Sequence, residues 1–507
     1  MIRFGGCEHG GLAMNWVNSV NRICCVACLL LLHLGCATPQ DHTLRSQQPN
    51  PILVVGTNKT KAKSQAEAWS SASSSDMKVV QASANELELR SDPSPMPPEQ
   101  LSLEATLQYA LSRNPQLTAI RQKHGVATAG VVIAKTYPFN PIYQGTFLHA
   151  KGAAAPVENS FFNSHEITLE VQLFHQQRFR QQQAFAALTR TDWEIATQEL
   201  TFAVNAIRAY DAYLYRKGKL AVSEEFLRLN QKSVEQVKEL VEQGKLKSGD
   251  LIVARAEVND VQTQVNLNRT ALITARRDFY RALGVREGEV EPVGTLERAA
   301  PAGNLDQYLS AASELRPDRF VWLAAVAEAE AEYQFQTAGR FGNPQVGPVY
   351  EYDDARTQFI GAKVQLPLPL FNRKPGERMQ AQARRALALA TVQQVDVEIS
   401  QDVRLALQRL TEAENWVETY RKELLPNLKK SLTDAELLFE QGQGGMDILR
   451  LLDVRRKLLR AQDGYLDALL AYTSTLADLA QAVGDPTLAM QPTPAAKSDE
   501  SGKGEKK

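Results

Sequence analysis

Cysteine is absent from most of this 507-residue chain. All five cysteines (Cys7, Cys24, Cys25, Cys28 and Cys36) lie within the first 36 residues, so the rest can form neither a disulfide nor a thiolate metal site. Long apolar runs are also missing after the N-terminal region, which excludes a polytopic helical membrane protein. Neither sign of charge dominates: 57 Lys and Arg stand against 58 Asp and Glu. The net charge of −1 gives no reason to expect a surface for nucleic acid or anionic lipid.

The N-terminal 36 residues have the pattern of a secretory signal. Arg22 precedes a short apolar run at residues 23–32, and Met14 would give a signal of ordinary length. The run ends in Leu34-Gly35-Cys36-Ala37, which resembles a bacterial lipoprotein box in which Cys36 is lipidated. Ordinary cleavage after Ala37 is the alternative. Either way, we expect the mature chain to leave the cytoplasm.

Two segments are predicted to lie outside the folded part. Residues 37–98 are rich in Ser, Gln, Pro and Ala, a composition typical of an extended or disordered tether. The tail at residues 486–507 has the same character.

The middle of the chain is a duplication with a period of roughly 200 residues. Landmarks recur in the same order, which predicts one repeat at residues 99–290 and a second at 291–485. The paired landmarks are Arg113-Asn-Pro115 with Leu315-Arg-Pro317, Glu242-Gln-Gly244 with Glu440-Gln-Gly442, and Ala282-Leu-Gly284 with Ala482-Val-Gly484.

Each repeat is predicted to contain a very long helix and shorter helices stacked beside it. The periodicity indicates helices at 101–112, 115–137, 176–243 and 250–283, then at 373–441 and 446–483. Turns are expected at 244–249 and 442–445, and Pro426 should kink the second long helix. In each repeat the two shorter helices together match the length of the long one and could run antiparallel to it.

Four segments of about ten residues are predicted to be strands, at 140–150, 166–173, 345–352 and 358–367. Ile167, Leu169, Val171 and Leu173 alternate with polar residues, as do Ile360, Ala362, Val364 and Leu366. This pattern fits membrane-spanning strands with lipid on one side and water on the other, but also a half-buried soluble sheet. Four strands are too few to close a barrel, so a membrane-spanning arrangement would require several chains.

With these motifs in place, the plan resembles the TolC family of outer-membrane efflux factors. The most specific stretches are 105–115, 365–373 and 439–449, and Leu-Pro-Leu-Pro-Leu-Phe-Asn-Arg at 366–373 is most similar to the CzcC/CusC-like branch. The resemblance implies an α+β fold: a trimeric, twelve-stranded outer-membrane barrel continued by a periplasmic helical tunnel. It also implies a periplasmic adaptor and an inner-membrane transporter, commonly of the RND type. The loops at 151–164 and 353–356 would then face outside the cell.

The same resemblance points to residues at the periplasmic tips. Asp447 matches a position whose acid narrows the entrance, while Arg450 replaces a second acid and Phe439 replaces a tyrosine latch. Asp250 and Arg255 match the closing network at the first tip, and the turns at Gly244 and Gly442 would contact the adaptor. Helix capping and surface pairing are the alternative for these residues.

No catalytic motif is present, so we expect no enzyme activity and no cofactor. His149, His165 and His175 flank the first strand pair, but polar strand-end residues explain them better than a metal site. The leading function is a passive exit duct for small solutes, with heavy-metal cations as the finer assignment. The alternatives are a duct for type I protein secretion and a non-channel envelope lipoprotein that uses its helices as a spacer.

Overall fold

The computed structural model describes residues 99–149, 161–286, 290–353, 357–440 and 448–491. The chain divides into two units, 1–48 and 49–507, and all described residues lie in the second. The predicted signal and tether lie outside the described residues, as do Cys36, Gly442 and Asp447. Of the predicted tail at 486–507, residues 486–491 are described; Pro486–Ala489 form a short 3₁₀ helix, and Ala489 is buried in the largest hydrophobic cluster, so the prediction of disorder is wrong for this part.

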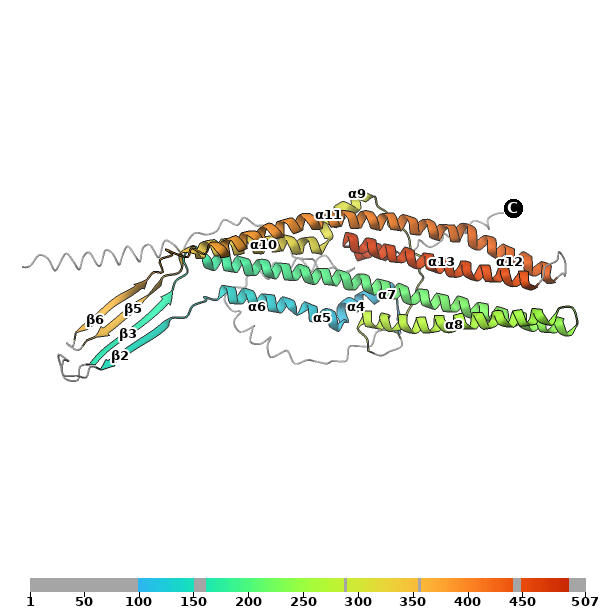
Figure 1. The fold of residues 1–507 in the computed structure, drawn as a ribbon, viewed down its shortest axis with the longest axis horizontal. Helices are drawn as coiled ribbons and strands as arrows, with labels where there is room; N and C mark the ends of the chain where they lie inside the picture. Colours follow the sequence, from blue (N-terminus) through green and yellow to red (C-terminus); the bar gives the residue numbers. More distant parts are fainter. Residues whose placement is uncertain (1–98, 150–160, 287–289, 354–356, 441–447, 492–507) are drawn as a thin grey trace, which may run out of the picture. The chain divides into compact units, whose positions relative to one another are not determined.

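In the first repeat, three helices precede one pair of long strands, and two long helices follow it (Figure 1). In chain order the elements are β1 (Gln100–Leu101), α4 (Leu103–Arg113), α5 (Pro115–Arg121), α6 (Lys123–Lys135), β2 (Ile142–His149), β3 (Phe161–Glu170), α7 (Gln176–Glu242) and α8 (Ser248–Leu283).

The second repeat follows the same plan. Its elements are β4 (Glu291–Pro292), α9 (Leu305–Leu315), α10 (Pro317–Ala338), η1 (Gly339–Phe341), β5 (Gln345–Tyr352), β6 (Gln358–Gln365), α11 (Pro375–Thr419), the π-helical turn η2 (Tyr420–Leu424), α12 (Leu425–Glu440), α13 (Ile448–Val483) and η3 (Pro486–Ala489). β1 pairs with β4 in parallel, which joins the starts of the two repeats.

The predicted stacking of shorter helices beside a long one is found in both repeats. In the first, α6 packs against the strand-proximal part of α7 and α8 against its other end (Figure 1). In the second, α10 and α13 pack against the long helix in the same way. Local sequence sets the helix ends: Asn114 accepts from the backbone N–H of Gln116 (2.9 Å) and caps α5, and α8 ends at Gly284, whose φ of +74° suits glycine.

Three boundaries differ from the sequence prediction. The helix expected at 115–137 is two helices, α5 and α6, which meet at Gln122. β3 begins at Phe161 and ends at Glu170, so Val171 and Leu173 lie beyond the strand. The chain there turns sharply into α7 through left-handed backbone at Phe174 and His175, which alternation of side chains does not reveal.

The second long helix is interrupted close to Pro426, where a kink was predicted. The π-helical turn lies at Tyr420–Leu424, and Pro426 is the second residue of α12. Proline cannot donate a backbone hydrogen bond, and its ring crowds the carbonyl four residues earlier, which is that of Lys422. A wider π-turn that contains Lys422 relieves this crowding.

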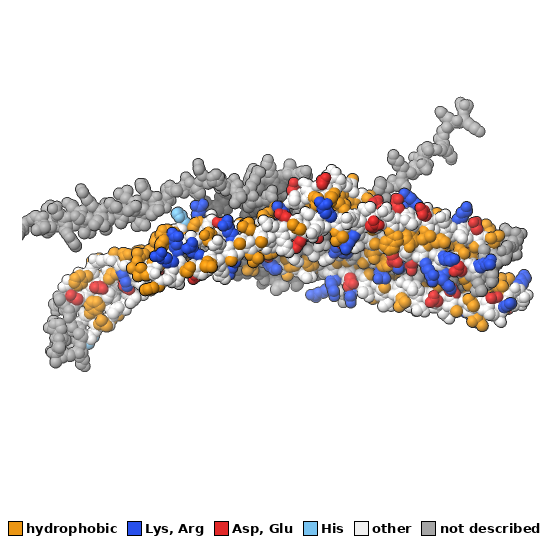
Figure 2. Space-filling model, turned by 45° about the horizontal axis from the view of Figure 1, so that its top comes forward, with side chains coloured by type: hydrophobic (Ala, Val, Ile, Leu, Met, Phe, Trp, Pro, Cys, Tyr) orange, Lys and Arg blue, Asp and Glu red, His pale blue; other side chains and the backbone are white. Residues whose placement is uncertain are grey.

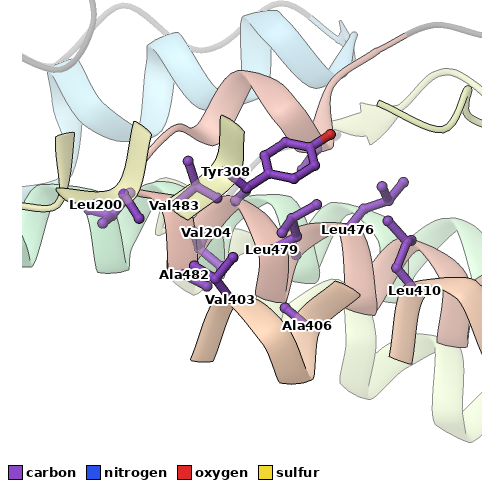
Figure 3. Close-up of a cluster of buried hydrophobic side chains, with 14 of the residues drawn as sticks. Leu200, Val204, Tyr308, Val403, Ala406, Leu410, Leu476, Leu479, Ala482 and Val483 are labelled. Atoms are coloured by element: carbon purple, nitrogen blue, oxygen red, sulfur yellow. The ribbon is translucent and has the colours of Figure 1, made fainter. Parts of the chain in front are cut away.

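The largest hydrophobic cluster holds the two repeats together. Leu200 and Val204 of α7 meet Tyr308 of α9, Val403 of α11 and Leu476 of α13 (Figure 3). Because its members come from both repeats, neither repeat can bury this cluster alone.

Within the described parts of the chain, no helix combines the length and the apolar character that crossing a membrane requires.

Candidate functional site

The four long strands form one antiparallel sheet in the order β2-β3-β5-β6. The central pair, β3 with β5, joins the first repeat to the second. Both outer strands, β2 and β6, have one edge without a partner strand in this chain. An unpaired edge carries backbone donors and acceptors that need partners.

The strand register separates the side chains into an apolar and a polar face. Tyr143 pairs with Ile167, and Tyr350 pairs with both His165 and Ile360, so these side chains share a face. The apolar face includes Tyr143, Phe147, Ile167, Leu169, Val346, Tyr350, Ile360 and Val364, together with His149, Asn163, His165 and Gln358. The polar face carries Gln144, Thr146, Ser164, Glu166, Thr168, Glu351, Lys363 and Gln365, but also the apolar residues Ile142, Leu148, Phe162, Val349 and Phe359.

Contacts on the polar face cross the sheet. The Lys363 Nζ on β6 lies 2.8 Å from both carboxylate oxygens of Glu166 on β3, spanning β5 between them. Gly347 of β5 pairs with Lys363 and has no side chain to obstruct this contact. Its lack of a side chain also admits the neighbouring strand, because a Cβ at Gly347 would lie 1.7 Å from the carbonyl oxygen of Ile167.

The apolar face is exposed in the single chain, and none of the described helices covers it. Ile360 is 84% exposed and Val364 is 71% exposed. A half-buried soluble sheet would place these side chains in a core. The exposure therefore favours the alternative, in which lipid covers the face.

The helices also leave two unpaired flanks. α7 and α13 are central, while α8 and α6 lie on one flank and α11 and α12 on the other (Figure 1). Both flanks carry exposed apolar side chains: Ile252, Leu267 and Ile273 on α8, and Leu387, Val397 and Leu405 on α11.

The first tip is a capped turn. Asp250 accepts a hydrogen bond from the backbone N–H of Lys247 (3.1 Å) and so caps the start of α8. Gly244 has a φ of +71°, a conformation that favours glycine. Arg255 is exposed, and no ion pair of it is found among the described residues. Capping is thus the observed role of Asp250, and the gate role of these residues stays a prediction.

Near the second tip, two adjacent arginines tie α13 to three other helices. Arg455 donates to Glu436 of α12 (2.7 Å) and to the hydroxyl of Ser233 on α7. Arg456 donates its Nε–H to Glu257 of α8 (3.2 Å), and this pairing raises the pKa of the guanidinium. The arginines therefore link the second repeat to the first close to the tips. Arg450 is exposed near the start of α13.

The sequence analysis missed this pair of arginines. A signal was available, because Glu257 occupies the buried stripe of α8 together with Ala254, Val261 and Val265. A carboxylate at such a position needs a partner. Phe439 packs beside the pair in an apolar cluster with Val237 and Leu451. An open groove of about 650 Å³ lies here, lined by residues of α7, α12 and α13 and of the turn after α7.

A buried ion pair fixes the segment that joins the two repeats. Arg298 is 4% exposed and pairs with Asp211 of α7, which is 2% exposed. Arg298 also donates to the carbonyl oxygen of Ala489 (2.8 Å) at the end of the second repeat. Burial raises the pKa of the Asp211 carboxyl to about 6, although Arg298 opposes the shift.

The histidines do not form a common site. His165 lies on the apolar face, where its Nδ1 is 2.8 Å from the Tyr143 hydroxyl and its ring stacks on Tyr350. His149 ends β2, and His175 precedes α7. Over the residues that the structure describes, no three His, Cys, Asp or Glu side chains are grouped as metal ligands would be.

Residues 106–285, which include most of the first repeat, match the family model of the outer membrane efflux protein. The duplicated fold around them is that of the TolC-like channels. The family match and the shared fold together support a TolC-like outer-membrane efflux factor. Channels of this family lie in the outer membrane with their helical part in the periplasm.

Several solved channels share the fold at low sequence identity. CusC has a TM-score of 0.64 at 18% identity, with 75% of this chain and 92% of that chain covered. The outer membrane channel CmeC of Campylobacter jejuni has a TM-score of 0.63 at 16% identity, covering 76% and 86%. VceC of Vibrio cholerae has a TM-score of 0.61 at 15% identity, covering 76% and 96%. No curated protein matches the sequence.

Proposed function

We propose that this efflux factor is the passive exit duct of a tripartite pump and works as a trimer. The observation that carries the proposal is the four-stranded sheet with an exposed apolar face and two unpaired edges. A sheet with open edges cannot stand in lipid, so β6 of one copy must pair with β2 of the next. Three copies would give the twelve strands expected from the resemblance.

The helical flanks support the same assembly. Pairing β6 with β2 brings the α11 and α12 flank of one copy toward the α6 and α8 flank of its neighbour. Both flanks carry exposed apolar side chains, so their contact buries them. The interface is head-to-tail, and a threefold rotation closes it.

The resting gate involves the arginines near the tips. An inward-leaning pair of α12 and α13 can move outward only if Arg456 leaves Glu257 and Arg455 leaves Ser233. Glu257, Arg455 and Ser233 are largely buried, so losing a partner costs more than the roughly 1 kcal/mol of an exposed pair, and the threefold symmetry multiplies the sum. Asp447, Arg450, Asp250 and Arg255 remain candidates for the same network, with Asp447 as the acid that attracts cations at the entrance.

A periplasmic adaptor would contact the turns at Gly244 and Gly442, and an inner-membrane transporter of the RND type would deliver the cargo. We propose small solutes as the cargo. The 366–373 stretch suggests heavy-metal cations as a finer hypothesis. The fold does not decide it, because it resembles CusC and CmeC to nearly the same degree. Cys36 is the proposed lipidation site.

Fractionation and conductance test the proposal. The protein should fractionate with the outer membrane, run as a heat-sensitive trimer, and open discrete channels in planar bilayers. A monomer without conductance would leave the spacer hypothesis standing. Conductance by a trimer that supports export of a protein, but restores no solute resistance, would favour the type I secretion duct.

A further inference from the structure

The net charge of −1 hides a strongly basic band where the strands meet the helices. Four segments converge there: 131–141, 171–185, 335–345 and 366–380. Together they contain seven Lys and Arg and a single acidic residue, Glu377; the basic residues are Lys135, Arg178, Arg180, Arg340, Arg373, Lys374 and Arg378. We call these seven side chains the basic collar. Figure 2 shows Lys and Arg side chains gathered at this junction beside hydrophobic ones.

The segments of the collar are in contact with one another. A Cβ at Gly342 would lie 2.7 Å from the ring of Pro367, and one at Gly339 would lie 3.7 Å from the Nζ of Lys374. The Gln176 amide donates to Asn343 (2.7 Å), which ties the start of α7 to the same place. The basic residues therefore belong to one surface despite their separation in sequence.

The seven basic side chains of the collar have no acidic partners in the part of the chain that the structure describes: none of them forms an ion pair with a carboxylate there. Glu170 at the end of β3 accepts from Asn343 (2.9 Å). One step further down the helices the pattern changes, since Arg384 pairs with Glu332 and Arg385 with Glu330.

Exposed aromatic and aliphatic side chains accompany the charges. Phe371 is 102% exposed, and Leu368 and Leu370 are also exposed. The Arg340 guanidinium lies 4.5 Å from the centre of the Phe341 ring, which in turn packs on Phe174 at 5.2 Å. Exposed apolar side chains beside cationic ones are the combination found where proteins meet the headgroup region of a bilayer.

We propose that the basic collar binds the phosphate groups of anionic phospholipids in the periplasmic leaflet of the outer membrane. The collar lies on the helix side of the strands, which is the periplasmic side, so the headgroups of that leaflet are at its level. Guanidinium and ammonium groups without a carboxylate partner complement lipid phosphates, and the exposed leucines and phenylalanines contact the acyl chains. Arg180 is half-buried and donates to the carbonyl oxygens of Ala134 and Thr136, so its charge contributes from behind the exposed members. Threefold symmetry would make the collar a ring of positive charge around the base of the barrel.

The proposal rests on the membrane placement of the strands, but its test is independent of transport. The purified full-length trimer is reconstituted in nanodiscs containing equal parts of phosphatidylcholine and phosphatidylglycerol with identical acyl chains. It is then extracted in mild detergent, and the retained lipids are quantified by mass spectrometry. The wild-type protein should retain phosphatidylglycerol roughly tenfold over phosphatidylcholine, and high salt should reduce this preference.

Charge-removing variants and matched controls decide the outcome. Arg340→Gln with Arg373→Gln and Lys374→Gln should abolish the preference, whereas Arg340→Lys with Arg373→Lys should retain it. Three exposed basic residues on the central helices, changed together (Lys232→Gln, Lys238→Gln, Lys457→Gln), serve as the control and should leave the preference unchanged.

Two results would overturn the proposal. One is an equal retention of both lipids by the wild-type trimer. The other is an unchanged lipid preference in the charge-removed trimer; if that trimer also binds the adaptor more weakly, the collar is a protein-binding surface instead. A wild-type protein that forms no SDS-resistant trimer would count against the proposed function rather than against the collar, and the same gel shows whether each variant assembles.

Discussion

The two repeats build the same order of elements, yet their long helices differ. α7 runs for 67 residues without interruption, whereas its counterpart breaks after 45 residues at the π-turn. Counting back from the equivalent glycines Gly244 and Gly442, Pro426 corresponds to Arg228; counting back from Gly284 and Gly484, Gly464 corresponds to Gln264. The Tyr420 ring lies directly on Gly464, because a Cβ there would be 2.5 Å from its hydroxyl oxygen. The comparison indicates that a few residues that differ between the repeats, rather than the fold they share, determine where the second long helix breaks.

The largest expected effect comes from breaking the buried ion pair between Arg298 and Asp211, which fixes the segment that joins the two repeats. Arg298→Met leaves Asp211 buried without its cation, which should cost about 3–5 kcal/mol at neutral pH. Burial already raises the pKa of Asp211 to about 6. The contribution of this shift to the free energy of unfolding is therefore greatest at pH values below the pKa that Asp211 has in the unfolded chain, and it is lost as the pH rises through about 6. Losing Arg298 raises this pKa further, and acidification from pH 8 to pH 5 should restore part of the stability. Heat-induced loss of the trimer at the two pH values measures this.

The control for this joint is a double variant. Asp211→Asn with Arg298→Met has no carboxylate to neutralise, so its melting midpoint should not rise on acidification. A pH response of equal size in both variants would assign the effect to other groups.

The next largest effect is expected from a charge placed on the apolar face of the sheet, in a strand of either repeat. Ile167→Lys in the first repeat and Ile360→Lys in the second both place a charge on the apolar face, at a cost of roughly 2–4 kcal/mol near the midplane of a bilayer. The polar-face controls, Gln144→Lys and Gln365→Lys, should be tolerated. Yield of folded trimer in the outer membrane is the measurement, and equal behaviour of the two sets would refute the assignment of faces.

A smaller effect is expected from making the second long helix resemble the first. Pro426→Ala restores a backbone donor and should stabilise the helix by about 1 kcal/mol, with the π-turn replaced by regular α-helix. If Tyr420 packing alone maintains the π-turn, the turn will persist in Pro426→Ala and disappear in Tyr420→Ala. A structure of each variant distinguishes the two causes.

The last effect concerns the contacts between the repeats near the tips. Arg456→Ala breaks the link between α13 and α8 and leaves the largely buried Glu257 without its partner, so it should raise single-channel conductance. Lys457→Ala removes an exposed pair with Asp453 on the same helix and should leave conductance unchanged. The same conductance change in both variants would place the gate elsewhere.

The sequence predicted the features that depend on local periodicity. The long helices, the duplication and the alternating strands follow from spacing alone, and 176–243 was within one residue of α7. The π-turn was anticipated only as a kink at Pro426, because its position also depends on Tyr420 meeting Gly464 across the bundle. The strand end at Glu170 depends on the left-handed residues that follow it.

The functional contacts were harder to predict because they join distant residues. Arg456 and Glu257 are almost 200 positions apart and meet only when the repeats pack together. The basic collar combines four segments, and the balanced total of charges conceals it. Asp250 could be read from the sequence as a cap or as a gate residue, and the structure shows the capping contact.

Disulfide cross-linking between the two edges of the sheet tests the assembly most directly. β2 and β6 are separated by β3 and β5, so their backbones within one chain are roughly 14 Å apart, too far for a disulfide. Double-cysteine variants are made, each with one cysteine on β2, at a position such as Thr146, and one on β6, at a position such as Gly361. The account predicts covalent dimers and trimers for the pairs in register, while a Ser164→Cys and Glu351→Cys control closes within one chain. Exclusively monomeric protein across the whole set would contradict the shared barrel.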